Sequence, residues 1–296
     1  YTLGLAQQSL ERRIEALTSF RRSVTLMPEN DLFWNGLAGI LCNTHFLQVD
    51  EQMFTDLEHL LERPTVAVSN VIRPIMRILK HHSIFNEILN ATNDDSKAFA
   101  LSYIVAAEKL STIPLLLKSM RLSPIYDLQL ENMLTVLRRT LLIDALDEKI
   151  SEKVLSFSAA LALHCFANEY VFTQSPEEKT ALEKLLNRIE IQVNDGKEIT
   201  PLHIIALGAY RPLYNFPWAK AVSVMAWDET TKAVIKRQTS EPLEEQAFYS
   251  EIPTITPINN TISISVREQY EEHPYPRWIK TGISDQARTI DAVLRM

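Results

Sequence analysis

The chain has 296 residues, of which 46% are hydrophobic and 23% charged, and its formal net charge is −7. This length leaves room for about two domains, and the hydrophobic share is sufficient for a buried core. The basic residues are scattered singly or in pairs among acidic ones. Such a distribution lacks the basic stripe of a nucleic-acid-binding surface, so we expect no nucleic-acid partner.

The chain is poor in glycine: it has six glycines, far below the average usage of about 7%. No two of them form a phosphate-binding loop, and the sequence contains neither a G-x-G-x-x-G nor a Walker motif. Low glycine together with abundant leucine, alanine, glutamate, lysine and arginine predicts a mostly α-helical protein.

The most apolar stretch, residues 154–172, contains His164, Asn168 and Glu169. We expect it to be a buried central helix and not a membrane span. The two cysteines, Cys42 and Cys165, lie far apart in apolar runs. Buried reduced thiols are expected there, as in a cytoplasmic protein.

Residues 1–28 predict a helical hairpin. The small residues Gly4 and Ala16 would let two helices approach closely, Phe20 would fill the space between them, and Pro28 would end the second helix. This spacing resembles that of a tetratricopeptide repeat.

A second hairpin begins with Trp34, Leu37 and Ala38 at the expected offsets, but Asp50 stands where a small residue is expected. Residues 1–48 are therefore interpreted as truncated and degenerate repeat hairpins. Because a solenoid needs about three repeats, we expect further repeats upstream.

Residues 49–240 predict an irregular helical middle domain, with helices broken by prolines. A long helix is expected over 128–146, with Arg138 and Arg139 on its solvent side. Ser175, Pro176 and Glu178 form a helix start with a capping box. Further helices are expected over 98–110, 201–208 and 218–238.

Residues 241–296 are expected to be a connector. Its acidic residues Glu241, Glu244, Glu245 and Glu251 could steer a basic protein substrate or form a solvated face. An extended run is expected over 252–258, a short strand over 262–266, where apolar residues alternate, and a last helix over 285–296.

Two other groups of residues are open to alternative interpretations. His164 and Cys165 could suggest a metal or nucleophile site, but adjacent helical residues point about 100° apart, so we expect core packing, no metal site and no catalytic residue. The aromatic residues around Tyr210 and Trp218 fit either a corner between helices or a peptide-binding groove.

The segment V-R-E-Q-Y-E-E-H-P-Y-P-R-W (266–278) combines aromatic, proline and arginine residues. It resembles a segment of bacterial proteins that join tetratricopeptide repeats to an S-adenosylmethionine-dependent methyltransferase domain. Residues 163–172 (L-H-C-F-A-N-E-Y-V-F), 209–213 (A-Y-R-P-L), and 241–245 (E-P-L-E-E) with Ile252-Pro253 resemble the same family. A weaker similarity links the chain to rickettsial-type protein lysine methyltransferases.

The resemblance implies a methyltransferase parent whose cofactor is S-adenosylmethionine and whose Rossmann-like catalytic domain follows the aromatic segment. Tyr270, Tyr275, Arg277 and Trp278 would form a strap over the cofactor pocket of that domain, with Tyr275 and Trp278 stacking on adenine or shaping a lysine channel. Arg277 would meet a carboxylate. The alternative is a structural linker whose aromatic residues hold two domains together.

Residues 1–296 are therefore expected to be a non-catalytic scaffold and substrate-recognition region, inactive alone, with a protein substrate or partner. The alternative is a helical adaptor for protein–protein contact without enzymatic role. Self-association and the methyl acceptor stay open.

Overall fold

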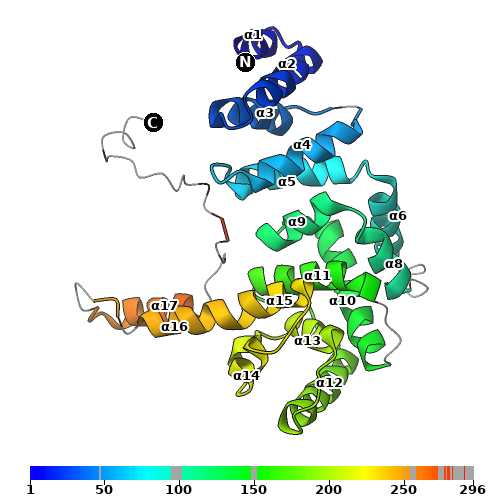
Figure 1. The fold of residues 1–296 in the computed structure, drawn as a ribbon, viewed down its shortest axis with the longest axis vertical. Coiled ribbons are helices and arrows are strands. Elements are labelled where there is room, and N and C mark those ends of the chain that lie inside the picture. Colours follow the sequence, from blue (N-terminus) through cyan, green and yellow to red (C-terminus); the bar gives the residue numbers. More distant parts are fainter. Residues whose placement is uncertain are drawn as a thin grey trace. The chain divides into compact units, whose positions relative to one another are not determined.

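The computed structural model describes residues 1–46, 48–94, 102–147, 152–249, 251–253, 258–272, 277, 279–280, 282 and 290. Within these residues every regular element is a helix (Figure 1), which confirms the prediction of a mostly α protein. Contacts divide the chain into two compact units, one of Tyr1–Ser83 with Trp278–Met296 and one of Ile84–Arg277. These divisions fall at other places than the expected boundaries after 48 and 240.

The first unit begins with five helices: α1 (Thr2–Ser9), α2 (Arg13–Leu26), α3 (Asp31–Asn43), α4 (Glu51–Glu62) and α5 (Val68–Leu79). Ala16 and Phe20 are fully buried. A Cβ added at Gly4 would lie 3.0 Å from the Phe20 ring, so α1 and α2 approach closely because this position has no side chain. The expected hairpin contacts are present, while the assignment to a tetratricopeptide repeat stays a prediction.

Asp50 departs from the repeat pattern because it starts α4. Its side chain accepts a 2.8 Å hydrogen bond from the backbone N–H of Met53. It also accepts two hydrogen bonds, of 3.0 and 2.9 Å, from the guanidinium of Arg21, whose Nε donates to Asp56 at 2.6 Å. Arg21 thus joins α2 to both the start and the middle of α4.

Two described residues after Arg277 pack on the first unit. The Lys280 ammonium donates a 2.7 Å hydrogen bond to the Leu61 carbonyl at the end of α4. Gly282 has a left-handed φ of 72°, and a Cβ there would lie 2.6 Å from the backbone nitrogen of Ala67. Only glycine fits this position without displacing the backbone.

The second unit contains the remaining helices: α6 (Ser83–Thr92), α8 (Tyr103–Leu110), α9 (Pro114–Leu122), α10 (Leu128–Leu146), α11 (Leu155–Ala167), α12 (Pro176–Asn194), α13 (Pro201–Gly208), α14 (Ala219–Ser223), α15 (Glu229–Ile235), α16 (Glu241–Tyr249) and α17 (Thr261–Glu272). Helix α11 is apolar on every side and packs against α9, α13 and α15 (Figure 1), as expected for a buried central helix. Among the described helices, none combines the length and hydropathy that crossing a membrane requires.

The helix starts follow the capping residues of the sequence. Helix α10 begins where Asp127 accepts a 3.1 Å hydrogen bond from Leu130 N–H. Helix α12 has the complete capping box: Ser175 Oγ accepts from Glu178 N–H at 3.2 Å, and Glu178 Oε2 accepts from Ser175 N–H at 2.8 Å. The predicted helices over 128–146 and from 176 are thereby confirmed.

Two local predictions are corrected. Residues 262–266 lie in α17 and not in a strand, because Asn260 caps a helix there by accepting from the N–H groups of Ile262 and Ser263. The expected helix over 218–238 is divided between α14 and α15. The connector is therefore helical over much of its described part, while 254–257 and most of 285–296 lie outside the described residues.

Candidate functional site

The four residues of the predicted strap differ in what the structure describes. Tyr275 and Trp278 lie outside the described residues. Tyr270 lies on α17 and is 63% exposed. Arg277 is held at the end of α11, and this contact leads to the candidate site.

Helix α11 ends in an unusual turn formed by Glu169 and Tyr170. Both have left-handed φ angles, 55° and 57°, although neither is glycine. The turn is closed by a 2.9 Å hydrogen bond from Tyr170 N–H to the Cys165 carbonyl, which is the long bond of a Schellman motif. Two successive left-handed residues with side chains cost about 1–2 kcal/mol each, so other contacts must hold this turn.

Arg277 supplies one of those contacts. Its Nε donates a short hydrogen bond to the Glu169 carboxylate, and the two side chains are only 11% and 15% exposed. Its guanidinium also lies over the Phe166 ring, 4.3 Å from the centroid. An ion pair shielded from water and stacked on an aromatic ring is stronger than an exposed pair.

Gln238 supplies the contacts on the Tyr170 side. It is fully buried in the π-helical segment Lys236–Ser240, and its Nε2 donates to the carbonyls of Ala162 at 3.1 Å and Gly208 at 2.9 Å. The Tyr170 hydroxyl lies 3.4 Å from the Gln238 Oε1 and from the Gly208 carbonyl. Burial raises the pKa of Tyr170 well above its usual value, so this hydroxyl stays protonated and can donate.

Arg138 was predicted to face solvent, and the structure contradicts this: its side chain is fully buried, whereas Arg139 is exposed. The guanidinium lies 4.2 Å from the Tyr210 ring centroid, and its Nη2 donates to the Thr173 carbonyl at 2.7 Å. The same nitrogen lies 3.5 Å from the Glu178 carboxylate. The prediction followed the charge of Arg138 and was wrong, because the position lies four residues from the buried Leu134 and Leu142 and therefore on the same buried face.

Glu178 connects this arginine to the Tyr210 corner. Its Oε1 accepts a 2.6 Å hydrogen bond from the Tyr210 hydroxyl, while Oε2 closes the capping box of α12. Burial raises the pKa of Tyr210. Tyr210 therefore belongs to a buried corner between helices; beyond it, Phe216 and Trp218 stack with their centroids 4.7 Å apart.

His164 and Cys165 lie in the core, as expected. Their exposed fractions are 1% and 0%. Burial lowers the pKa of His164 to about 4 and raises that of Cys165 to about 12. The thiol is therefore protonated at neutral pH, and no group of three or more potential metal-ligating His, Cys, Asp or Glu residues occurs in the part of the chain that the structure describes.

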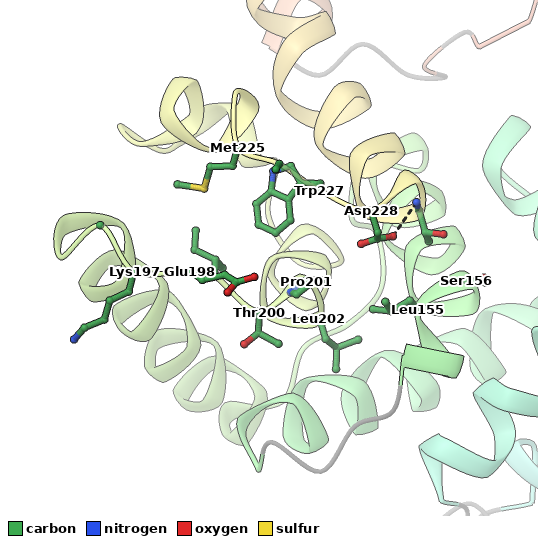
Figure 2. Close-up of a pocket in the computed structure, with 14 residues that line it drawn as sticks. Leu155, Ser156, Lys197, Glu198, Thr200, Pro201, Leu202, Met225, Trp227 and Asp228 are labelled. Atoms are coloured by element: carbon green, nitrogen blue, oxygen red, sulfur yellow. Dashed lines mark hydrogen bonds between the residues drawn. The ribbon is translucent and has the colours of Figure 1, made fainter.

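A pocket of about 880 Å³ lies elsewhere in the second unit, between the α12–α13 connection and the start of α15. Figure 2 shows Trp227 pointing toward its middle and Lys197 pointing away from it. Asp228 on its wall accepts from Thr230 N–H at 2.9 Å as the cap of α15 (Figure 2). Neither Tyr270 nor Arg277, the two described residues of the predicted strap, lines this pocket.

The candidate site is therefore the end of α11, defined here by Phe166, Glu169, Tyr170, Gln238 and Arg277. Sequence reasoning singled out the stretches that contain Phe166, Glu169 and Arg277, but it did not pair Glu169 with Arg277. The sequence analysis did not identify Gln238. The one feature that could have indicated it is the presence of a polar residue on the apolar face of a predicted helix. The arrangement positions backbone segments, and it offers no nucleophile or exposed base.

Comparison with known proteins adds no relative: no protein-family model, no curated protein and no solved structure matches this chain.

Proposed function

We propose that this chain is the non-catalytic scaffold and substrate-recognition region of a methyltransferase that uses S-adenosylmethionine and acts on protein. The proposal starts from the resemblance of four sequence stretches to that family. In such an enzyme the methyl group passes directly to a nucleophile, so correct positioning of substrate and cofactor contributes much of the rate. The helical chain would supply this positioning.

One observation supports the proposal: two of the four stretches that resemble the family meet at the end of α11. Stretch 163–172 supplies Phe166 and Glu169, and stretch 266–278 supplies Arg277, which contacts both. Stretch 209–213 begins directly after Gly208, the acceptor for Gln238. Residues that contact one another in the fold are expected to occur together in the members of a family. Their contact at the end of α11 therefore supports a common function for the two stretches.

Arg277 is then a positioning residue. The sequence suggested that it meets a carboxylate, and in the structure that carboxylate is Glu169 of this chain. In the proposal, holding Arg277 would limit where its sequence neighbours Tyr275 and Trp278, which lie outside the described residues, could reach. In the proposal these two aromatic side chains extend toward a cofactor pocket formed outside residues 1–296, because six scattered glycines provide no glycine-rich loop here.

The second candidate is a helical adaptor, favoured by the apolar side chains that the first unit exposes. Leu3, Leu10 and Ile14 are 64%, 70% and 61% exposed on α1, α2 and their connection. Exposed apolar side chains on two successive helices are the kind of surface that a partner helix can cover. It favours stacking against a protein, with or without an enzyme attached.

The coding sequence beyond Met296 distinguishes the two candidates. A strand followed by a glycine-rich loop within about 50 residues, as in a dinucleotide-type fold, supports the methyltransferase parent. A stop codon or another helical repeat supports the adaptor. Calorimetric titration of S-adenosylmethionine is the companion measurement: the product of the complete reading frame is expected to bind and residues 1–296 alone are not, and tight binding by residues 1–296 would overturn the proposal.

A further inference from the structure

The pocket shown in Figure 2 has the size and the walls of a small-molecule site. Its volume is about 880 Å³, and ligand pockets in proteins measure roughly 300–1,000 Å³. Apolar side chains from three regions wall it: Leu155 of α11, Leu202 of α13, and Met225 before α15. None of the residues that define the candidate site lines it, so this pocket is a separate feature of the second unit.

Trp227 presents an aromatic ring to this pocket. Its side chain is half-buried and points toward the middle of the pocket (Figure 2). The indole N–H donates a 2.9 Å hydrogen bond to the Val222 carbonyl, which fixes the orientation of the ring and satisfies its one polar group. The ring therefore offers a ligand its electron-rich π system, which attracts cations and quaternary ammonium groups in particular.

The ionisable side chains that line the pocket are Lys197, Glu198 and Asp228. Lys197 points away from it (Figure 2) and pairs with Asp195 at 2.7 Å. The Glu198 side chain reaches toward the pocket on one side of Trp227, and Asp228 stands on the other side (Figure 2). The charges that face a ligand are therefore negative.

Asp228 keeps its charge at neutral pH. Burial opposes its ionisation, but hydrogen bonds from the Thr231 hydroxyl and from the N–H groups of Thr231 and Thr230 outweigh this effect and lower the pKa of Asp228. A fixed carboxylate at the edge of an apolar concave wall raises the local concentration of cations.

We propose that this pocket binds a small organic cation, in which a quaternary or alkylated ammonium group is attached to an apolar body. The ammonium group would lie against the Trp227 ring, between the carboxylates of Glu198 and Asp228. The apolar body would cover the apolar wall, where the flexible thioether of Met225 adapts to its shape.

The composition of the pocket disfavours other classes of ligand. An anion or a zwitterion would bring negative charge toward Glu198 and Asp228, and like charges repel. A divalent metal ion lacks a ligand set, because the described ranges contain no group of three or more His, Cys, Asp or Glu side chains that could hold one. The lysine side chain of a protein, a four-carbon stem with an ammonium group, would fill only part of the pocket.

Binding at this pocket needs neither methyl transfer nor the domain that is expected after Met296. It therefore goes beyond the function proposed above and can succeed or fail independently of it.

The test uses choline and two analogues of nearly the same size. In dimethylbutanol an uncharged tert-butyl group replaces the trimethylammonium group, and in glycine betaine a carboxylate replaces the hydroxymethyl group. Binding of each compound to the 296-residue chain is measured by ligand-observed NMR titration. We expect saturable binding of choline that weakens with added salt, and about tenfold weaker binding of both analogues.

Variants identify the residues that are responsible. Trp227→Leu is expected to weaken choline binding about tenfold, because it removes the π system but keeps an apolar side chain. Trp227→Phe, which keeps a ring, is expected to weaken it less. Glu198→Gln and Asp228→Asn each remove one charge and are expected to weaken binding roughly threefold, while asparagine still caps α15.

Glu229→Gln is the matched control, because it removes an exposed charge beside Asp228 that does not line the pocket. It is expected to leave the affinity unchanged. Circular dichroism of each variant confirms that the fold is kept.

Several results would overturn the proposal. Dimethylbutanol bound as tightly as choline would show that the pocket selects apolar bulk and not charge, and betaine bound as tightly would assign the selection to backbone N–H groups at the helix starts. No binding of choline, or equal affinity in Trp227→Leu and Glu198→Gln, would contradict the ligand or the site. A peptide with trimethyllysine that binds at least tenfold more tightly than choline would replace the small molecule by a protein partner.

Discussion

At the scale of single residues, the second unit depends on charges buried in its core. Arg138 has no exposed surface, and Glu178 beside it is 4% exposed. Burying two charges requires compensation from hydrogen bonds and rings. Here Thr173 and Tyr210 provide it, so the pair is a point at which a single substitution has a large effect.

Replacing Arg138 by alanine is expected to lower the free energy of unfolding by about 3–5 kcal/mol, because it leaves the Glu178 carboxylate buried without its cation. Arg139, the exposed neighbour on the same helix, is the matched control. Arg139→Ala should change stability by no more than about 0.5 kcal/mol. Urea unfolding of both variants measures the difference, and similar values for the two would contradict the buried pair.

His164 makes the stability depend on pH. Its pKa is lowered from the ordinary 6.5 to about 4 by burial, so between these values the unfolded chain binds a proton that the folded chain does not. Stability should therefore fall as the pH is lowered from 6.5 toward 4, by on the order of 1 kcal/mol for each pH unit. Urea unfolding at several pH values should show a shallower fall in His164→Phe than in the unsubstituted chain.

At the scale of the element, capping decides where helices start, and much of this could be predicted from the sequence. Ser175, Pro176 and Glu178 placed α12 correctly because the capping box is a local signal. Residues 262–266 were predicted to be a strand because isoleucine and valine alternate there with polar residues. The same alternation also occurs in an exposed helix, and α17 is such a helix. Asn260, as the cap, favours the helix.

The cap of α12 can be measured directly. Ser175→Ala removes the acceptor for the Glu178 N–H and should reduce the free energy of unfolding by about 1 kcal/mol. Ser175→Asp, which keeps an acceptor, should retain most of the stability. Equal losses for both variants would show that the cap does not contribute.

The turn that ends α11 should control how firmly Arg277 is held. Glu169→Gln removes the charge that pairs with Arg277 and should accelerate trypsin cleavage after Arg277 roughly tenfold, as expected for the loss of a shielded charged hydrogen bond. Glu229→Gln, on the exposed surface of α15, should leave the rate unchanged. Timed proteolysis with mass spectrometry gives both rates.

At the scale of the whole molecule, fold class could be predicted from composition, but the candidate site could be predicted only in part. Low glycine and helical periodicity indicate helices. Glu169 and Arg277 are more than a hundred positions apart in the sequence. A local sequence pattern cannot predict a contact between residues that far apart. Arg138 shows the same limit, because a buried arginine depends on partners from three other segments.

In the proposed function, the helical chain would hold the connector at Arg277, and the aromatic residues beside it would serve a cofactor-binding domain. The affinity of the complete reading-frame product for S-adenosylmethionine, measured by calorimetry with Glu169 intact and replaced by glutamine, tests this claim most directly. We expect micromolar binding that weakens about tenfold, equivalent to about 1.4 kcal/mol, in Glu169→Gln and stays the same in the surface control Glu183→Gln. No binding by the unsubstituted protein, or equal affinity in Glu169→Gln, would contradict it.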